Sequence, residues 1–234
     1  MPRVLVVQNT PRGGPGRFGD WLAEDGLVLD VVHAYGGAAL PRRLAHRAVM
    51  VLGGGYLPDD DVRAPWLAPT RALVAQALEQ GAPVLGICLG GQLLAQVAGG
   101  TVEGRRGEPE FGSTPLTVRP EAEADPVFGQ LPGRVTAIER HVDAITALPP
   151  GAAWLMESER CPYQAFRVGD RAWGVQFHPE VGADQVRSWD PERLRAHGVD
   201  PEGVHRGAER DEPAAGAAWR EVARRFAAVV RRTS

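Results

Sequence analysis

Lysine is absent from this chain of 234 residues, and all 26 basic residues are arginine. No catalytic Schiff base can therefore form on a lysine, and no phosphate-binding loop that depends on a lysine can be present. Cysteine is scarce, because only Cys88 and Cys161 occur, and two are too few for a disulfide framework. The sequence has no C-x-x-C motif and its six histidines are scattered, so we expect no metal site and no cofactor.

Strong charge and long apolar runs are missing as well. A formal net charge of −3 gives no electrostatic reason to expect binding to nucleic acid or to a membrane. No run of 18 apolar residues occurs, and the first ten residues resemble a strand more than a signal peptide. We therefore expect a cytoplasmic protein whose length and composition suit one α/β domain with its own core.

The first hundred residues alternate short apolar runs with helical patterns. The runs predicted as strands are Val4–Gln8, Leu27–Val32, Ala48–Leu52 and Val84–Ile87, and the predicted helices are Phe18–Glu24, Leu67–Gln80 and Leu89–Ala98. Such alternation predicts right-handed crossovers and an open, mainly parallel twisted sheet flanked by helices.

The second half of the chain has a different pattern. Short β segments are predicted at Leu116–Arg119, Arg134–Ile138, Ala165–Val168 and Trp173–Phe177. Few helices separate them, so we expect an antiparallel β portion here. Residues 189–214 are predicted to be a solvated connector with one short helix, followed by a closing amphipathic helix over Ala217–Val230. We predict a single domain over 1–234, in which 183–234 form a C-terminal connector and helix.

The stretch "VLGICLGGQLLAQ" places Cys88 where a strand runs directly into a helix. A sharp strand-to-helix corner projects its side chain above the sheet and aims backbone N–H groups at a reacting carbonyl. The helix N-terminus also favours the thiolate form of a cysteine. The sequence therefore makes Cys88 a candidate nucleophile, although a buried cysteine with only a packing role fits the same pattern.

A second stretch, "GVQFHPE", supplies the base that a cysteine nucleophile needs. Pro179 disfavours a helical backbone at His178. In an extended segment residues two apart face the same way, so His178 and Glu180 are predicted to lie side by side. Glu180 would then orient the imidazole ring of His178.

The two motifs G-x-C-x-G-x-Q and F-H-P-E together resemble the class I glutamine amidotransferase domain. The resemblance covers roughly residues 3–182 and includes "VLGGGYLPDDD", "EFG", "RHVDAITALPPGA" and "CPYQAFRVGD" in the family's order. By pattern, the nearest relatives are stand-alone domains similar to the amidotransferase half of GMP synthase. The resemblance implies the flavodoxin-like architecture of that family.

The resemblance also implies roles for individual residues. Cys88 would attack the side-chain amide of glutamine, His178 would transfer protons and Glu180 would orient His178. The N–H groups of Gly54 and Leu89 would form the oxyanion hole. The substrate-binding residues implied are Gln92, Arg140, His141 and Val142. The family usually has a small polar residue and a glycine where Arg140 and Val142 stand.

Three functions remain open from the sequence. The first is hydrolysis of L-glutamine through a cysteine thioester, with the ammonia passed to a separate synthase chain, because no S-G-G-x-D-S loop of a fused synthetase occurs. The second is hydrolysis of γ-glutamyl peptides or conjugates. The third is a non-catalytic binding module on the same fold.

Overall fold

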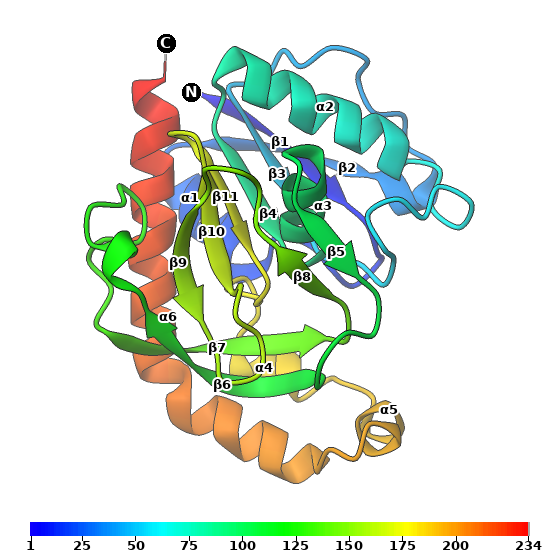
Figure 1. Ribbon diagram of the computed structural model, residues 1–234, viewed down its shortest axis with the longest axis vertical. Coiled ribbons are helices and arrows are strands. Elements are labelled where there is room, and N and C mark those ends of the chain that lie inside the picture. Colours follow the sequence, from blue (N-terminus) through cyan, green and yellow to red (C-terminus); the bar gives the residue numbers. More distant parts are fainter. Residues whose placement is uncertain (234) are drawn as a thin grey trace.

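Nine strands form one sheet through the centre of the computed structural model, which describes residues 1–233 (Figure 1). The nine strands are β1 (Arg3–Gln8), β2 (Val28–His33), β3 (Ala48–Val51), β4 (Val84–Ile87), β6 (Glu110–Val118), β7 (Arg134–His141), β9 (Ala153–Glu157), β10 (Ala165–Val168) and β11 (Ala172–Val175). Their order is β2-β1-β3-β4-β11-β10-β9-β6-β7.

The direction of the strands changes at β11. The strands β2, β1, β3, β4 and β11 pair in parallel, and the pairs from β11 through β10, β9, β6 and β7 are antiparallel. A separate antiparallel pair joins β5 (Thr101–Glu103) to β8 (Ala144–Ala147). The predicted fold class, an α/β sheet with an antiparallel portion in the second half, is confirmed.

Helices cover both faces of the parallel strands. The helices are α1 (Gly16–Glu24), α2 (Leu67–Gln80), α3 (Leu89–Val97), α4 (Ala183–Val186), α5 (Pro191–Ala196) and α6 (Pro201–Arg232), with short 3-10 turns at Ala34–Gly36 and Pro120–Ala122. Along β1, Val4 and Val6 belong to a core cluster with α1 and α6, whereas Leu5 and Val7 belong to one with α2 and α3. This alternation is the period-two pattern of a strand buried on both faces.

The C-terminal region is more helical than its composition predicts. The helix α6 begins at Pro201, not at Ala217, because Asp200 caps it by accepting hydrogen bonds from the N–H groups of Glu202 and Gly203. It continues through Pro213 and runs the height of the molecule (Figure 1). The short helix expected within residues 189–214 is present as α5, but the expectation of a solvated connector from Pro201 onward is wrong. No helix within residues 1–233 is long and apolar enough to cross a membrane.

Glycines bring α3 unusually close to the sheet. A Cβ atom at Gly90 would overlap the carbonyl oxygen of Val51 on β3, and one at Gly91 would lie 2.5 Å from the carbonyl oxygen of Val175 on β11. A Cβ at Gly86 would in turn overlap the backbone of Gly90. The helix can therefore lie directly on three strands only because side chains are missing at these positions.

A buried polar cluster joins β6 to β7. Glu110 is 3% exposed and accepts hydrogen bonds from Ser158 Oγ at 2.8 Å and Gln164 Nε2 at 2.8 Å, while Nε2 of His141 lies 3.0 Å from its Oε2. Glu139 lies beside it, with Oε2 3.5 Å from Nε2 of His141. Neither carboxyl oxygen of Glu139 has a hydrogen-bond partner within the described chain. Burial, followed by the charge of Glu110, raises the pKa of Glu139 well above its ordinary value.

The same cluster brings three groups that can ligate metals within 4.8 Å of one another: Glu110, His141 and Cys161. Its geometry is that of a hydrogen-bonded network, because Glu110 and His141 already bond to each other. Burial, together with the charges of Glu139 and Glu110, raises the pKa of Cys161 to about 12, so its thiol stays protonated at neutral pH. We therefore explain the cluster as an internal support of β7.

The substitution Gly90→Ala tests the close approach of α3 to β3. We expect it to lower the free energy of unfolding by about 1–3 kcal/mol, because backbone must move to admit the methyl group. Alanine would otherwise favour the helix. The matched control is Gly36→Ala, where an added Cβ meets nothing within 4 Å and the expected change is under ~0.5 kcal/mol. Urea unfolding measures both, and equal stability of the two variants would contradict the packing argument.

The substitution Glu139→Gln tests the buried carboxyl. A carboxyl whose pKa is raised by folding stabilises the protein fully below its unfolded pKa, and this contribution is lost as the pH rises toward the folded pKa. We therefore expect Glu139→Gln to stabilise the protein more at about pH 8 than at about pH 5, by more than ~0.5 kcal/mol. Thermal melts at both pH values measure this, with the exposed Glu79→Gln as control. A pH-independent difference would show that Glu139 is charged in the folded state.

Candidate active site

Cys88 occupies the corner between β4 and α3, in a backbone conformation that side chains rarely adopt. Its φ is 51° and its ψ is −110°, which costs free energy unless the surroundings impose it. They do so here, because the N–H of Cys88 donates to the carbonyl of Val175 at 2.8 Å and its own carbonyl accepts from the N–H of Gln92 at 2.9 Å. Cys88 is 6% exposed and lines a cavity of about 900 Å³.

His178 and Glu180 follow β11, the strand next to β4. Nδ1 of His178 lies 2.6 Å from Oε1 of Glu180, which is 5% exposed. The segment is held by β7, since the N–H of His178 donates to the carbonyl of Ile138 at 2.8 Å. It is also held by α1, since Nε of Arg17 donates to the carbonyl of Pro179 at 3.0 Å. The side-by-side placement predicted for His178 and Glu180 is therefore present.

His178 also faces Cys88 across Gly53. A Cβ atom at Gly53 would lie 2.9 Å from Cε1 of His178 and 3.5 Å from Cβ of Cys88. Burial alone would lower the pKa of His178, but the carboxylate of Glu180 and the sulfur of Cys88 raise it well above its ordinary value. With Nδ1 bonded to Glu180, the other ring nitrogen is left to exchange a proton with the thiol.

Gly54 and Leu89 lie together beside the thiol. A Cβ at Gly54 would lie 2.8 Å from Cδ2 of Leu89 and 3.1 Å from Cβ of Asn9. Leu89 is the first residue of α3, so its N–H has no acceptor within the helix. The loop at Gly54 is fixed by Asn9, whose Nδ2 donates to the carbonyl of Leu52 at 2.7 Å and whose Oδ1 accepts from Nε1 of Trp66 at 3.0 Å.

Gln92 is held by two hydrogen bonds from its own amide nitrogen. Its Nε2 donates to the carbonyl of Asp143 and to Oε1 of Gln176, both at 3.1 Å. Nε2 of Gln176 in turn lies 3.7 Å from the sulfur of Cys88. The side-chain oxygen of Gln92 accepts no hydrogen bond from the described residues, so it remains open to a ligand in the cavity that Gln92 lines.

The three predicted substrate-binding residues on and after β7 differ in whether their side chains are already bonded within the protein. Arg140, His141 and Val142 all line the cavity. Both ring nitrogens of His141 are engaged, with Nδ1 3.1 Å from the carbonyl of Asp143 and Nε2 on Glu110, so His141 holds the segment in place. Arg140 instead points its guanidinium over the ring of Trp189, 4.9 Å from the ring centroid.

The cavity above Cys88 has a volume of about 900 Å³. It lies at the carboxyl ends of β3 and β4, where ligands bind in open α/β sheets. Its walls come from the loops after β3 and β5, from β7 and from α5, and include Tyr56, Phe111 and Trp189.

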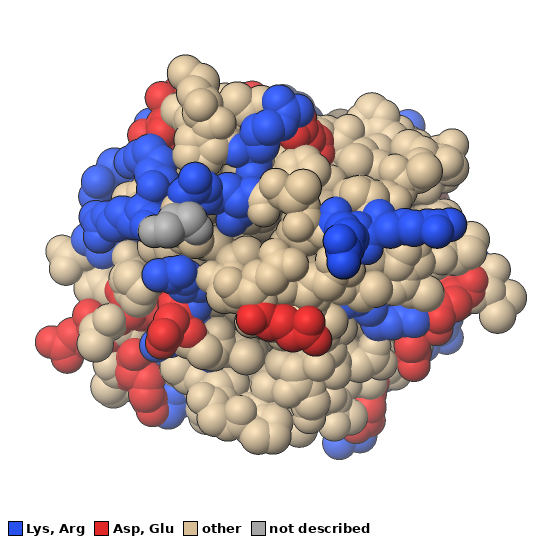
Figure 2. Space-filling view, turned by 90° about the horizontal axis from the view of Figure 1, so that it is seen from above, with Lys and Arg blue, Asp and Glu red and all other residues tan. Residues whose placement is uncertain are grey.

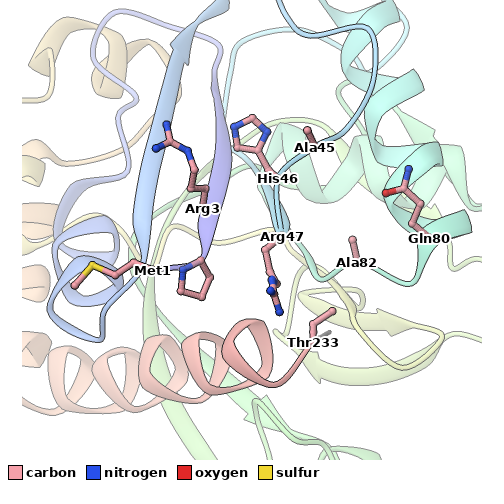
Figure 3. A pocket seen from close by; sticks show the side chains of 9 residues that line it. Met1, Arg3, Ala45, His46, Arg47, Gln80, Ala82 and Thr233 are labelled. Carbon is pink, nitrogen blue, oxygen red and sulfur yellow. The ribbon is translucent and has the colours of Figure 1, made fainter.

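A second hollow lies at the opposite edge of the sheet, near the two chain termini (Figure 3). Arg3, His46 and Arg47 line it, and arginine side chains gather on this end of the molecule (Figure 2). Asp30 pairs with both Arg3 and His46, and the hollow lies away from Cys88, His178 and Glu180, none of which lines it. It is therefore not a candidate active site.

Several residues of this site were not singled out from the sequence. Two of them, Trp189 and Arg193, line the cavity. Three others contact residues around it: Asn9, Glu110 and Gln176. Gln176 lay inside the motif "GVQFHPE", two residues before His178, so its alternation with His178 could have placed it on the same side. The others act through contacts between residues far apart in the chain, which no local pattern reveals.

Comparison with known proteins places this geometry in a family. The family model for glutamine amidotransferase class-I matches residues 35–188, a range that includes Gly54, Cys88, His178 and Glu180. The GMP synthase [glutamine-hydrolyzing] of Thermus thermophilus is 40% identical over 176 residues, which are 68% of this chain and 33% of the relative. The chain thus spans about a third of that relative's length.

Two further comparisons agree. A protein of Thermococcus kodakarensis, named as one subunit of GMP synthase [glutamine-hydrolyzing], is 39% identical over 117 residues, 47% of this chain and 60% of the relative. The crystal structure of a glutamine amidotransferase from Thermotoga maritima superposes with a TM-score of 0.86 at 28% identity, covering 97% of this chain and 98% of that one. This chain belongs to the class I glutamine amidotransferase family.

Proposed function

We propose that the chain hydrolyses the side-chain amide of L-glutamine through a thioester on Cys88 and releases ammonia to a separate synthase chain. The observation that carries this proposal is the 2.6 Å contact between His178 and Glu180 next to a thiol on a strained corner. Membership of an enzyme family makes the same chemistry the first expectation.

In the first half of the reaction, the sulfur of Cys88 attacks the amide carbon of glutamine while His178 takes the thiol proton. The N–H groups of Leu89 and Gly54 stabilise the oxyanion that forms, a role worth about 3–4 kcal/mol per donor in other enzymes. The carbon–nitrogen bond then breaks, and His178 gives its proton to the departing ammonia. Glu180 stabilises the charged imidazole and orients it throughout.

In the second half, water attacks the thioester. His178 removes a proton from the water, the carbon–sulfur bond breaks, and His178 returns the proton to the sulfur as glutamate leaves, which restores the thiol. Gln92 would hold the substrate through its free side-chain oxygen, and the segment of His141 and Val142 would receive the α-amino and α-carboxylate groups.

A separate acceptor of the ammonia is proposed from the relatives. The Thermococcus relative is named as one subunit of a glutamine-hydrolysing GMP synthase, so there is a precedent for a synthase that works with a separate amidotransferase chain. The convergence of Cys88, His178 and Glu180 argues against a non-catalytic binding module.

Hydrolysis of γ-glutamyl peptides or conjugates is the second candidate function. It uses the same thioester and replaces ammonia by an amine as the leaving group. The cavity of about 900 Å³ above Cys88 favours it, because this space exceeds what a free amino acid fills.

Ammonia release from purified protein tests the proposal, with Cys88→Ala as the decisive variant. We expect this variant to lose about four orders of magnitude or more in rate, because no other group can form the thioester. The matched control is Cys161→Ala, which removes the buried thiol that stays protonated and should keep its activity. Ammonia is measured with L-glutamine as substrate, and with γ-glutamyl-p-nitroanilide the product measured is p-nitroaniline. Equal hydrolysis by wild type and Cys88→Ala, or none by wild type on either substrate, would contradict the proposal.

A further inference from the structure

The cavity above Cys88 is large for glutamine. Its volume of about 900 Å³ lies near the top of the range of about 300–1,000 Å³ that pockets for drug-sized ligands span. Free glutamine in contact with Cys88 would leave much of this space to water. A substituent on the γ-amide nitrogen could fill it.

Positive charge dominates the walls of this cavity. Four arginines line it, Arg63, Arg105, Arg140 and Arg193, against two carboxylates, Asp143 and Asp190. Both carboxylates accept backbone hydrogen bonds at 2.9 Å, Asp143 from the N–H of Arg105 and Asp190 from the N–H of Glu192. Arg63 is paired with Asp60, which does not line the cavity.

Arg140 and Arg193 are the pair of interest, because neither has an ion-pair or hydrogen-bond partner for its guanidinium among residues 1–233. Both residues are exposed and line the same cavity. Partial burial of its guanidinium, followed by the charge of Arg193, lowers the pKa of Arg140. Two positive charges on the wall of one cavity, without a partner in the described chain, attract an anion.

The folded chain fixes the side chain of Arg140 and the backbone that carries Arg193. Arg140 lies on β7 and is stacked over Trp189, which is 7% exposed. Arg193 lies on α5, which docks through Leu194, 3% exposed, into the same apolar cluster as Trp189. The guanidinium of Arg140 is therefore positioned before binding by its stack on Trp189, whereas the exposed side chain of Arg193 would become ordered on binding.

We propose that Arg140 and Arg193 form a subsite for a carboxylate on the substituent of the γ-amide nitrogen. The planar guanidinium fork matches a carboxylate with two parallel hydrogen bonds. The substrate class is then γ-glutamyl amino acids and peptides. The inference rests on the proposed thioester chemistry: Cys88 attacks the γ-carbonyl, the carbon–nitrogen bond breaks, and the amino acid leaves with the proton from His178. Water then releases glutamate as before.

Binding to the Cys88→Ala protein tests the subsite without turnover. Isothermal titration compares γ-glutamyl-glutamate with γ-glutamyl-glutaminamide, which has the same frame but carboxamides in place of both carboxylates of the second residue. We expect the dicarboxylate to bind at least about tenfold more tightly. Adding Arg193→Gln should bring the ratio of the two dissociation constants close to one.

The matched control is Arg195→Gln on the same helix. Arg195 does not line the cavity and is paired with Glu192 at 2.6 Å, so its substitution should keep the tenfold ratio. Thermal melts establish that all variants are folded. Equal affinity of the two ligands, no binding of either, or an equal loss of preference in Arg195→Gln would overturn the subsite.

The outcome is separable from that of the proposed function. If Cys88-dependent ammonia release is found but the two ligands bind equally, the hydrolase stands and the subsite fails. If the carboxylate preference depends on Arg193 but Cys88→Ala hydrolyses as fast as wild type, the subsite stands and the thioester chemistry fails.

Discussion

The contact of α3 with the sheet is the constraint on which the rest of the site depends. Because Gly90 and Gly91 carry no side chains, the helix lies against the backbone of β3 and β11. Its first residues are thereby locked at the carboxyl edge of the sheet, and the strained backbone of Cys88 is imposed by hydrogen bonds on both sides of it. The strain is stabilised by the packing of the whole parallel sheet.

The antiparallel half of the sheet also positions residues at the carboxyl edge of the parallel strands. β7 supplies the carbonyl of Ile138 that holds His178, and it continues into the segment that forms one wall of the cavity. The hydrogen bond between Glu110 and His141 supports that segment. The same cluster also buries a second acid, Glu139, whose carboxyl oxygens have no hydrogen-bond partner in the described chain. The strand β7 thus contacts the proposed proton-transfer residue, His178, and also leads into the proposed substrate-binding wall of the cavity.

Local patterns predicted the part of the site that neighbouring residues determine. The thiol corner and the pairing of His178 with Glu180 follow from strand and helix periodicity and from Pro179, and the fold class and family were predicted as well. Long-range contacts were not predictable in this way. His141 lines the cavity as its predicted role requires, but the contact of its ring with Glu110, 31 residues earlier, was not predicted. Pro213 and the charged composition hid the first half of α6, and with it the apolar docking of α5.

The central claim is that Cys88 carries a γ-glutamyl thioester during turnover. Acid quenching of wild-type protein during hydrolysis of L-glutamine, followed by mass spectrometry of its peptides, measures this directly. The account predicts one γ-glutamyl group on the peptide that contains Cys88 and none in the Cys88→Ala protein. Glutamine hydrolysis with the adduct on another residue, or an adduct that persists in Cys88→Ala, would contradict it.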